Sequence, residues 1–243
     1  LAASSPGLLL FIDYDGTLSG IRSRPDEAQL DSAARRLLAS LCRLAGLRVV
    51  ILSGRDRTFL QSQFKGMNLE LAAEHGAEYY LSADNSWKVL VRSDTSLWYQ
   101  KACRSMEGYV SRVPGSFLEK KSHSISWHYR LSPRLFGDFQ ARRMLSELRS
   151  GFANLPVSVS PGKKVVDVRS LEADKGLFVK WYLQELGSGP QDCGVIAIGD
   201  DETDESMFKA LANRENCVTI KIGYEPTAAG FRLSGQEDIR EFL

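Results

Sequence analysis

Residues 8–18 read LLLFIDYDGTL, an apolar run that ends in two aspartates one residue apart. Five consecutive apolar residues before a turn signal predict a buried strand of a parallel sheet with helices on both faces. Asp13 and Asp15 then lie at the carboxyl end of that strand, where open α/β sheets place their ligands. Because residues i and i+2 of an extended chain point the same way, both carboxylates can face one position. Such a pair needs a cation, a shared proton or a chemical task; the alternative is that one caps a helix and the other is solvated.

The composition is that of an ordinary globular protein, with 43% hydrophobic and 25% charged residues in a chain of 243. No apolar run approaches the length of about 18 residues that a membrane span needs, and no secretory signal pattern is present. The four cysteines lack paired spacing, which favours reduced thiols in the cytoplasm and argues against a zinc site. A net charge of +1 gives no general attraction to nucleic acid or to a membrane surface.

The charge is unevenly distributed along the chain. Residues 79–166 hold 14 Lys and Arg against 6 Asp and Glu, whereas the remainder holds 17 against 24. This division suggests an acidic and a basic body that face each other across a cleft, with an anion and a cation between them. A solvated surface with no such role would give the same counts.

Strands and helices alternate at both ends of the chain. Predicted strands at 8–12, 47–52 and 69–73 enclose helices at 31–45, capped by Asp31, and from 56 onward. The same rhythm returns with a helix at 174–186, a strand at 195–198, a helix at 202–212, a strand at 218–222 and a helix from 237. Repeated βα units are typical of a parallel sheet.

The rhythm changes between these ends. Near residue 78 the pattern becomes a hairpin (79–81 and 87–91), a helix (95–113), two alternating strands (116–121 and 124–129), a helix (133–150) and two more strands (157–160 and 163–168). We therefore predict an α/β fold with a Rossmann-like parallel-sheet core formed by residues 1–77 and 168–243. Residues 78–167 form an inserted α+β cap domain.

A second acidic group follows a predicted strand. Residues 200–205 contain five carboxylates in six positions, a density that favours a bound divalent cation, and Mg²⁺ suits oxygen ligands. Acidic residues also favour a helix N-terminus, and we assign Glu202 and Glu205 to that role. Asp200 and Asp201 are assigned to the cation, and Asp204, one helical turn from Asp200, can support it from behind.

Two further features suit an anion. Ser53-Gly54-Arg55 offers a hydroxyl and backbone N–H groups at a strand-to-helix turn, although Ser-Gly is also a common turn. Lys175 begins a helix, where a cation meets the positive end of the helix dipole. A bound phosphate would relieve this unfavourable position, whereas a solvated lysine is the plainer interpretation.

The order of these motifs resembles the haloacid dehalogenase superfamily of phosphatases. The matching motifs are Asp-x-Asp-Gly-Thr from Asp13, Ser-Gly-Arg from Ser53, Lys-Gly from Lys175 and Gly-Asp-Asp-x-x-Asp from Gly199. The resemblance spans residues 11–222. The resemblance implies the α/β fold that the periodicity predicts, and a phosphatase activity.

The resemblance also implies a role for each of these residues. Asp13 would attack phosphorus and form an aspartyl phosphate, and Asp15 would act as general acid and then general base. Mg²⁺ would be held by the Asp13 carboxylate, the Asp15 carbonyl and Asp200. Asp201 and Asp204 would support the metal site from behind. Ser53 and Lys175 would bind the phosphoryl oxygens.

Glu119-Lys120-Lys121, Ser124 and His128-Tyr129-Arg130 of the inserted segment resemble the trehalose-6-phosphate phosphatase branch of this superfamily. The stretches 73–76 (AEHG), 162–169 and 199–205 resemble it as well. The resemblance implies that the substrate contacts Arg55, Glu119, Lys121, Ser124, His128, Arg130, Lys163 and Asp167. Alternation places Ser124 and His128 on one side of their strand; a solvated sheet face is the alternative. The branch usually has Glu where this chain has Asp167, which leaves the sugar preference open. His75 is not included in the predicted site.

The expected activity is Mg²⁺-dependent hydrolysis of trehalose 6-phosphate. Two alternatives remain open: a related phosphatase acting on sucrose phosphate or mannosyl-3-phosphoglycerate, or a regulatory module without activity. The resemblance also implies fusion to, or association with, a trehalose-phosphate synthase, because many such chains are fused. All four residues whose loss would mark an inactive module are present: Asp13, Asp15, Lys175 and Asp200. We expect a cytoplasmic protein with no nucleic-acid or membrane partner.

Overall fold

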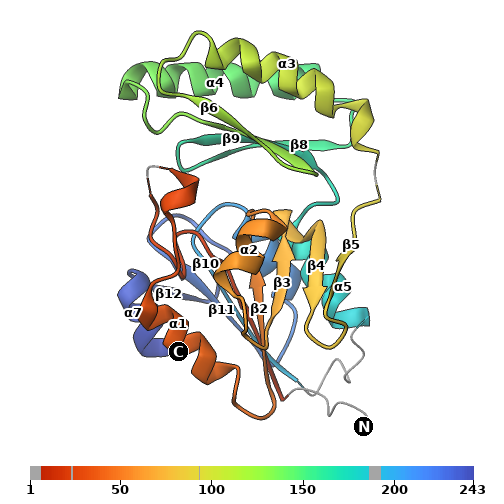
Figure 1. Ribbon diagram of the computed structural model, residues 1–243, viewed down its shortest axis with the longest axis vertical. Helices are drawn as coiled ribbons and strands as arrows, with labels where there is room; N and C mark the ends of the chain where they lie inside the picture. Colours follow the sequence, from red (N-terminus) through yellow and green to blue (C-terminus); the bar gives the residue numbers. More distant parts are fainter. Residues whose placement is uncertain (1–6, 23, 93, 186–192) are drawn as a thin grey trace. The chain divides into compact units, whose positions relative to one another are not determined.

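The computed structural model describes residues 7–22, 24–92, 94–185 and 193–243. The chain forms two compact units (Figure 1). The first contains residues Leu1–Leu90 and Asp174–Leu243, and the second contains Val91–Ala173.

The first unit contains an eight-stranded sheet in the order β12-β11-β10-β1-β2-β3-β4-β5. The strands from β12 to β3 run parallel, and β4 and β5 are antiparallel additions at one edge. Their bounds are β1 Leu8–Ile12, β2 Leu47–Leu52, β3 Glu70–Ala73, β4 Glu78–Leu81, β5 Ser86–Val89, β10 Gly194–Gly199, β11 Cys217–Ile222 and β12 Phe231–Leu233.

The strand order reverses at β1. From β1 the chain proceeds to β2 and β3 on one side, and it later returns to β10 and β11 on the other. Such a reversal leaves a crevice at the carboxyl ends of the two central strands, where α/β proteins bind ligands. Ile12 pairs with Ile198 in register, and the Asp13 N–H donates to the Ile198 carbonyl at 2.9 Å. The residues that follow β1 and β10 therefore meet at one edge.

Helices cover both faces of this sheet because its strands are apolar on both sides. Leu10 and Ile12 pack with α1 (Ser32–Leu41), α2 (Arg57–Gln63) and α7 (Gln236–Phe242), whereas Leu9 and Phe11 pack with α5 (Lys175–Glu185) and α6 (Asp204–Leu211). The predicted cap Asp31 is present, since its carboxylate accepts from the N–H groups of residues 33 and 34 at 2.9 and 2.8 Å. The strand-end edge is thus built on a rigid double-sided core.

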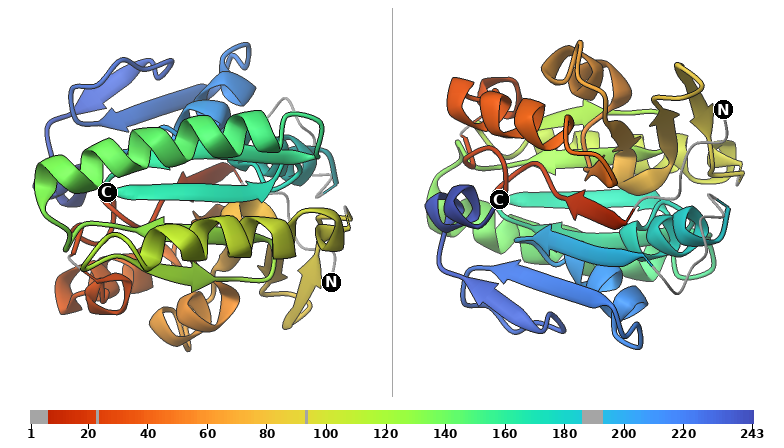
Figure 2. Two further views of the ribbon diagram at one scale, coloured as in Figure 1. Left: turned by 90° about the horizontal axis from the view of Figure 1, so that it is seen from above. Right: turned by 90° about the horizontal axis from the view of Figure 1, so that it is seen from below.

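The second unit is an antiparallel sheet with helices on one face. Its strands β6 (Phe117–Lys120), β7 (Ser124–His128), β8 (Val157–Gly162) and β9 (Val165–Ser170) lie in the order β6-β7-β9-β8. Helices α3 (Tyr99–Val110) and α4 (Arg134–Gly151) lie side by side against it (Figures 1 and 2). Ile125 and Trp127 are fully buried in the core that these helices share. Alternation therefore places Ser124, Ser126 and His128 on the opposite face of the sheet.

The predicted α/β fold class is confirmed, but the predicted domain limits are wrong. The hairpin at 78–89 extends the large sheet, because β4 pairs with β3, and β9 continues in the small sheet to Ser170. The division therefore lies at 90/91 and 173/174 rather than at 77/78 and 167/168. The change of pattern near residue 78 reflects a change of strand direction within the large sheet and not the start of the second unit. Strand β4 pairs with the backbone groups that β3 would otherwise expose.

The three-residue strand β12 was not predicted, since its pattern is too short to recognise. Of the predicted helix 174–186, residue 186 lies outside the described residues. Within the described part of the chain, no helix combines the length and apolar character needed to cross a membrane.

A buried polar group at the start of β3 gives a testable pH dependence. Glu70 is 5% exposed; it accepts a hydrogen bond from Tyr182 Oη at 2.9 Å, and Arg48 Nε lies 3.6 Å away. Burial raises the pKa of Glu70, and the Tyr182 and Arg48 contacts oppose this only in part. A carboxyl whose pKa is raised by folding stabilises the fold fully below its unfolded pKa, and this contribution is lost as pH rises through the folded pKa.

Glu70→Gln should therefore gain stability relative to the wild type as pH rises from about 4 to about 7. Urea unfolding of both proteins at the two pH values measures the difference. The exposed Glu237 supplies the control, Glu237→Gln, for which the difference should stay near zero. A Glu70→Gln difference that shrinks with rising pH would contradict the assignment.

Candidate active site

Asp13 and Lys175 form a buried ion pair at the carboxyl edge of the large sheet. Asp13 directly follows β1, and Lys175 is the first residue of α5. The Lys175 ammonium is 2% exposed and donates to Asp13 Oδ1 at 2.6 Å and to Asp204 Oδ1 at 2.7 Å. One cation therefore ties the end of β1 to the start of α6. Burial alone lowers the pKa of Lys175, but the two carboxylates more than offset this and raise it, so the ammonium stays charged.

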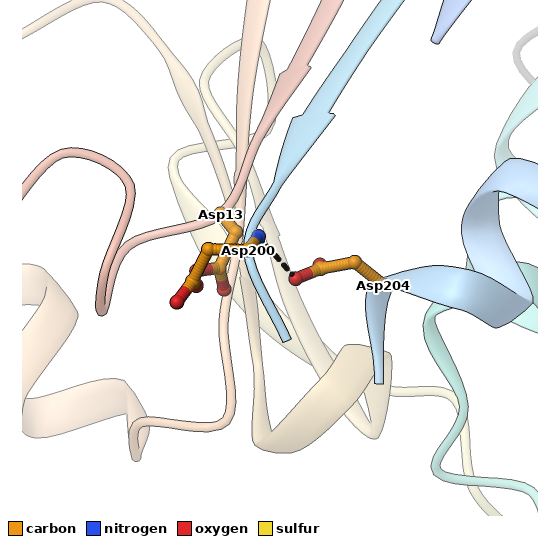
Figure 3. Close-up of side chains that lie close together, drawn as sticks. All are labelled: Asp13, Asp200 and Asp204. Atoms are coloured by element: carbon orange, nitrogen blue, oxygen red, sulfur yellow. Dashed lines mark hydrogen bonds between the residues drawn. The ribbon is translucent and has the colours of Figure 1, made fainter. Parts of the chain in front are cut away.

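Asp204 is held from both sides. Its Oδ2 accepts from the N–H groups of Asp200 and Asp201, each at 3.0 Å, while its Oδ1 accepts from Lys175. Figure 3 shows Asp204 reaching from α6 toward the backbone of Asp200. A Cβ on Gly199 would lie 2.2 Å from Asp204 Cγ, so this position requires glycine. The loop after β10 is thus folded around the Asp204 carboxylate.

Three buried carboxylates converge here. Ligand oxygens of Asp13, Asp200 and Asp204 all lie within 4.8 Å of one another (Figure 3). Burial raises the pKa of Asp13 well above its ordinary value; Lys175 opposes this, and the charges of Asp204 and Asp200 add to it. Gly16, at φ +86°, lets the Asp200 carboxylate approach, since a Cβ there would lie 2.0 Å from Asp200 Oδ2. An all-oxygen group of this charge fits a hard divalent cation.

Asp15 has a different partner from Asp13. Its carboxylate accepts from Arg55 Nε at 2.6 Å and from Arg55 Nη2 at 2.5 Å, a bidentate pair. Arg55 is fixed in turn, because its Nη1 donates to the Pro25 carbonyl at 2.6 Å and its guanidinium lies 4.5 Å from the centre of the Phe59 ring. The Asp15 side chain is 38% exposed, so it is the more accessible of the two predicted catalytic carboxylates.

Ser53 lies at the end of β2, the strand beside β1. It is fully buried, its N–H donates to the Ala72 carbonyl at 3.0 Å, and its Oγ accepts from the Arg55 N–H at 3.2 Å. The structure therefore brings together the strand ends predicted to carry the site, those of β1, β2 and β10, along one edge.

The predicted substrate contacts of the second unit form two groups on its sheet. Glu119 Oε2 lies 2.8 Å from His128 Nε2 and 3.3 Å from Lys121 Nζ, and His128 stacks on Phe117 with ring centres 4.9 Å apart. Asp167 pairs in register with Ser126 and accepts a hydrogen bond from the Ser126 hydroxyl group.

The remaining predicted contacts are placed differently. Arg130 donates to the carbonyl of Lys163 at the turn between β8 and β9, where the Lys163 side chain is exposed. Ser124 is 1% exposed and lies opposite Arg169 in register.

One residue that supports the acidic loop was not predicted. Lys221, at the end of β11, is 2% exposed; its ammonium lies 3.3 Å from the Asp201 carbonyl and 3.6 Å from Glu205 Oε1. Glu205 therefore does more than favour a helix N-terminus, since it neutralises a buried cation behind the acidic loop. The signal was a lysine within a strand whose other residues, apart from Thr219, are apolar.

Residues 11–237 match the family model described as trehalose-phosphatase. The chain belongs to the trehalose-phosphatase family. It is 37% identical over 236 residues to the bifunctional trehalose-6-phosphate synthase/phosphatase of Thermoproteus tenax. The aligned region covers 97% of this chain and 31% of that protein. The chain thus spans less than a third of the length of that curated relative.

Solved structures agree with this membership. The C-terminal domain of Candida albicans trehalose-6-phosphate phosphatase superimposes with a TM-score of 0.90 at 30% identity, covering 98% of this chain and 90% of that one. A haloacid dehalogenase-like hydrolase from B. subtilis has a TM-score of 0.66 at 16% identity, covers 96% of each chain, and shows the same fold. The predicted family is therefore confirmed.

Proposed function

We propose that this trehalose-phosphatase family member hydrolyses trehalose 6-phosphate to trehalose and phosphate through an aspartyl phosphate on Asp13. The observation that carries the proposal is the buried Lys175 ammonium, which holds Asp13 beside Asp200 and Asp204 at the strand reversal. The trehalose-phosphatase family model and the names of the relatives support the substrate.

Mg²⁺ is the proposed cofactor. Asp13, Asp200 and the Asp15 carbonyl would hold it, whereas Asp204 has both oxygens engaged and supports the site from behind. Asp201 is only partly buried, and its Oδ1 accepts from the Glu202 N–H at 2.7 Å, which also suits a supporting role. The bound ion would supply positive charge to the phosphoryl oxygens.

The chain's own residues account for the group transfer. A carboxylate oxygen of Asp13 forms a bond to phosphorus while the bond from phosphorus to the sugar oxygen breaks. Protonated Asp15 gives its proton to that leaving oxygen. Ionised Asp15 then takes a proton from a water whose oxygen bonds to phosphorus, while the bond from phosphorus to the Asp13 oxygen breaks and phosphate leaves. Lys175 and Ser53 balance the charge on the phosphoryl oxygens.

Arg55, a predicted substrate contact, lies beside Asp15 in this structure. Its donors lie on Asp15 and on the Pro25 carbonyl. We propose that Arg55 orients the Asp15 carboxylate toward the reacting oxygens. Asp15 must loosen this pair when it carries a proton to the leaving oxygen.

The second unit supplies the proposed sugar-binding residues. Glu119, Lys121 and His128 present a carboxylate, an ammonium and an imidazole within one hydrogen-bonded group, and hydroxyl-rich ligands need such a mixture. Asp167 is shorter by one methylene than the Glu that the family branch usually has at this position. One of its carboxylate oxygens already accepts a hydrogen bond from Ser126.

Glu119→Gln should raise the KM for trehalose 6-phosphate about 10- to 100-fold, the loss expected when a hydrogen bond to a charged group is weakened. Hydrolysis of p-nitrophenyl phosphate, which carries no sugar, should change little. Steady-state kinetics with both substrates makes the comparison. Glu107→Gln is the matched control, because Glu107 in the same unit pairs with Lys120 at the surface. Equal losses on both substrates would argue against a sugar contact.

We further propose that the module works fused to, or in association with, a trehalose-phosphate synthase. The Thermoproteus tenax relative is named as a synthase and phosphatase, and a relative from Dictyostelium discoideum is named as a synthase.

The function is tested by phosphate release from four substrates: trehalose 6-phosphate, glucose 6-phosphate, sucrose 6-phosphate and mannosyl-3-phosphoglycerate. Each is assayed with Mg²⁺ and with EDTA. The proposal expects a marked preference for trehalose 6-phosphate and no release in EDTA. A preference for another of the four esters would support the phosphatase mechanism and overturn the assignment of trehalose 6-phosphate as substrate. No phosphate release from any of the four would indicate a regulatory module.

A further inference from the structure

Three consecutive residues adopt left-handed backbone conformations directly after β3. Glu74, His75 and Gly76 have φ of 45°, 60° and 96°. For glutamate and histidine this region is sterically unfavourable, and it persists only where surrounding structure imposes it. Both residues are buried, at 2% and 8% exposure. The turn lies at the same sheet edge as the candidate active site, because β3 is the neighbour of β2.

The turn makes backbone hydrogen bonds to the Ser53-Gly54-Arg55 loop. The Glu74 N–H donates to the Arg55 carbonyl at 2.9 Å, and the His75 N–H donates to the Ser53 carbonyl at 2.8 Å. The two acceptor carbonyls therefore belong to the residues directly before and after Gly54. The Glu74 N–H follows the extended Ala73, whereas the left-handed conformation of Glu74 sets the direction of the His75 N–H.

The His75 ring lies where a side chain at position 54 would be. A Cβ on Gly54 would lie 2.7 Å from His75 Nε2 and 2.8 Å from its Cε1. The ring therefore packs directly on the Gly54 backbone and limits how far the loop can move.

The same turn also contacts the helix that carries Lys175. A Cβ on Gly76 would lie 2.4 Å from Phe178 Cβ, so Gly76 packs against α5 within one turn of Lys175. Residues 74–76 thus touch the loop that bears Ser53 and the helix that bears Lys175. These are the two residues assigned to the phosphoryl oxygens.

We propose that His75 is a positioning residue for phosphate binding. Its left-handed turn and its ring set the spacing between the Ser53 loop and Lys175, and thereby the fit of the phosphoryl group. The inference rests on the proposed phosphatase function.

The variants separate the ring from the backbone conformation. His75→Asn keeps a residue that tolerates the left-handed region but removes the ring, and His75→Phe keeps a ring without its nitrogens. Asn85→Ala is the control, because Asn85 has φ 48° at the exposed turn between β4 and β5. Inorganic phosphate, titrated calorimetrically in the presence of Mg²⁺, is the probe, and the melting temperature of each variant is recorded.

His75→Asn should weaken phosphate binding about 10-fold or more, because small displacements of positioned groups are costly. His75→Phe should recover most of the affinity, whereas Asn85→Ala should lower the melting temperature without changing phosphate affinity. Unchanged phosphate affinity in His75→Asn would overturn the proposal and leave His75 a purely structural residue. If the wild type binds phosphate but hydrolyses no sugar phosphate, the proposed function is overturned and the proposed role of His75 in phosphate binding is not.

A second design covers variants of His75 that fold poorly. Gly54→Ala should weaken phosphate binding, since its methyl group displaces the His75 ring. Adding His75→Gly to Gly54→Ala gives the methyl group room, so the double variant should bind phosphate more tightly than Gly54→Ala alone. Independent, additive losses would contradict a contact between ring and loop that matters for binding.

Discussion

Replacing Asp13 with asparagine should lower the rate of phosphate release from trehalose 6-phosphate by about 10⁴-fold or more. The amide keeps the shape of the side chain but cannot attack phosphorus, so the aspartyl phosphate cannot form. Steady-state kinetics with Mg²⁺ measures the loss. Asp26→Asn, at an exposed position in the 3₁₀ turn Pro25–Glu27, is the control and should retain full activity.

The same substitution should not weaken the fold. Because burial raises the pKa of Asp13 well above its ordinary value, the ionised form is disfavoured in the folded protein. A neutral isostere removes this penalty, so in EDTA near pH 7 the melting temperature of Asp13→Asn should equal or exceed that of the wild type. Such a gain of stability with loss of activity is typical of a functional site. A variant that melts lower would show that the ion pair with Lys175 outweighs the repulsion.

Lys175→Met should have the second largest effect, on both activity and stability. Losing one preorganised positive group at the phosphoryl oxygens should lower the rate about 10²- to 10³-fold. The fold should lose about 3–5 kcal/mol in EDTA, because Asp13 and Asp204 are left buried without their shared cation. Lys180→Met, on the exposed side of the same helix, is the matched control.

A double variant distinguishes the two effects of Lys175. Lys175→Met combined with Asp204→Asn removes one charge of each sign, so urea unfolding should show part of the lost stability restored. Activity should stay low, since the phosphoryl oxygens still lack the ammonium. Recovery of activity in the double variant would show that Lys175 serves only to hold the fold.

The sequence was most informative where a regular element sets the position of a side chain. Asp13, Ser53 and Asp200 each follow an apolar strand, and parallel strands end at one edge, so their convergence was predictable. The alternation that placed His128 opposite the buried Trp127 is likewise a property of the strand itself.

Features that depend on distant contacts were not predictable. The pair between the Arg55 guanidinium and Asp15, 40 residues away in sequence, was not predicted. No periodicity shows which way a side chain turns after its strand has ended. The left-handed turn at Glu74 and His75 was missed for the same reason, because neither residue type favours it and only tertiary contacts impose it.

The most direct test of the account is to trap the covalent intermediate. Enzyme mixed with trehalose 6-phosphate and Mg²⁺ is quenched in acid during the first turnovers, and the peptides are analysed by mass spectrometry after borohydride reduction of any acyl phosphate. We expect the modification at Asp13, and none in Asp13→Asn. Phosphate release without modification of Asp13, or modification at another carboxylate, would contradict the central claim.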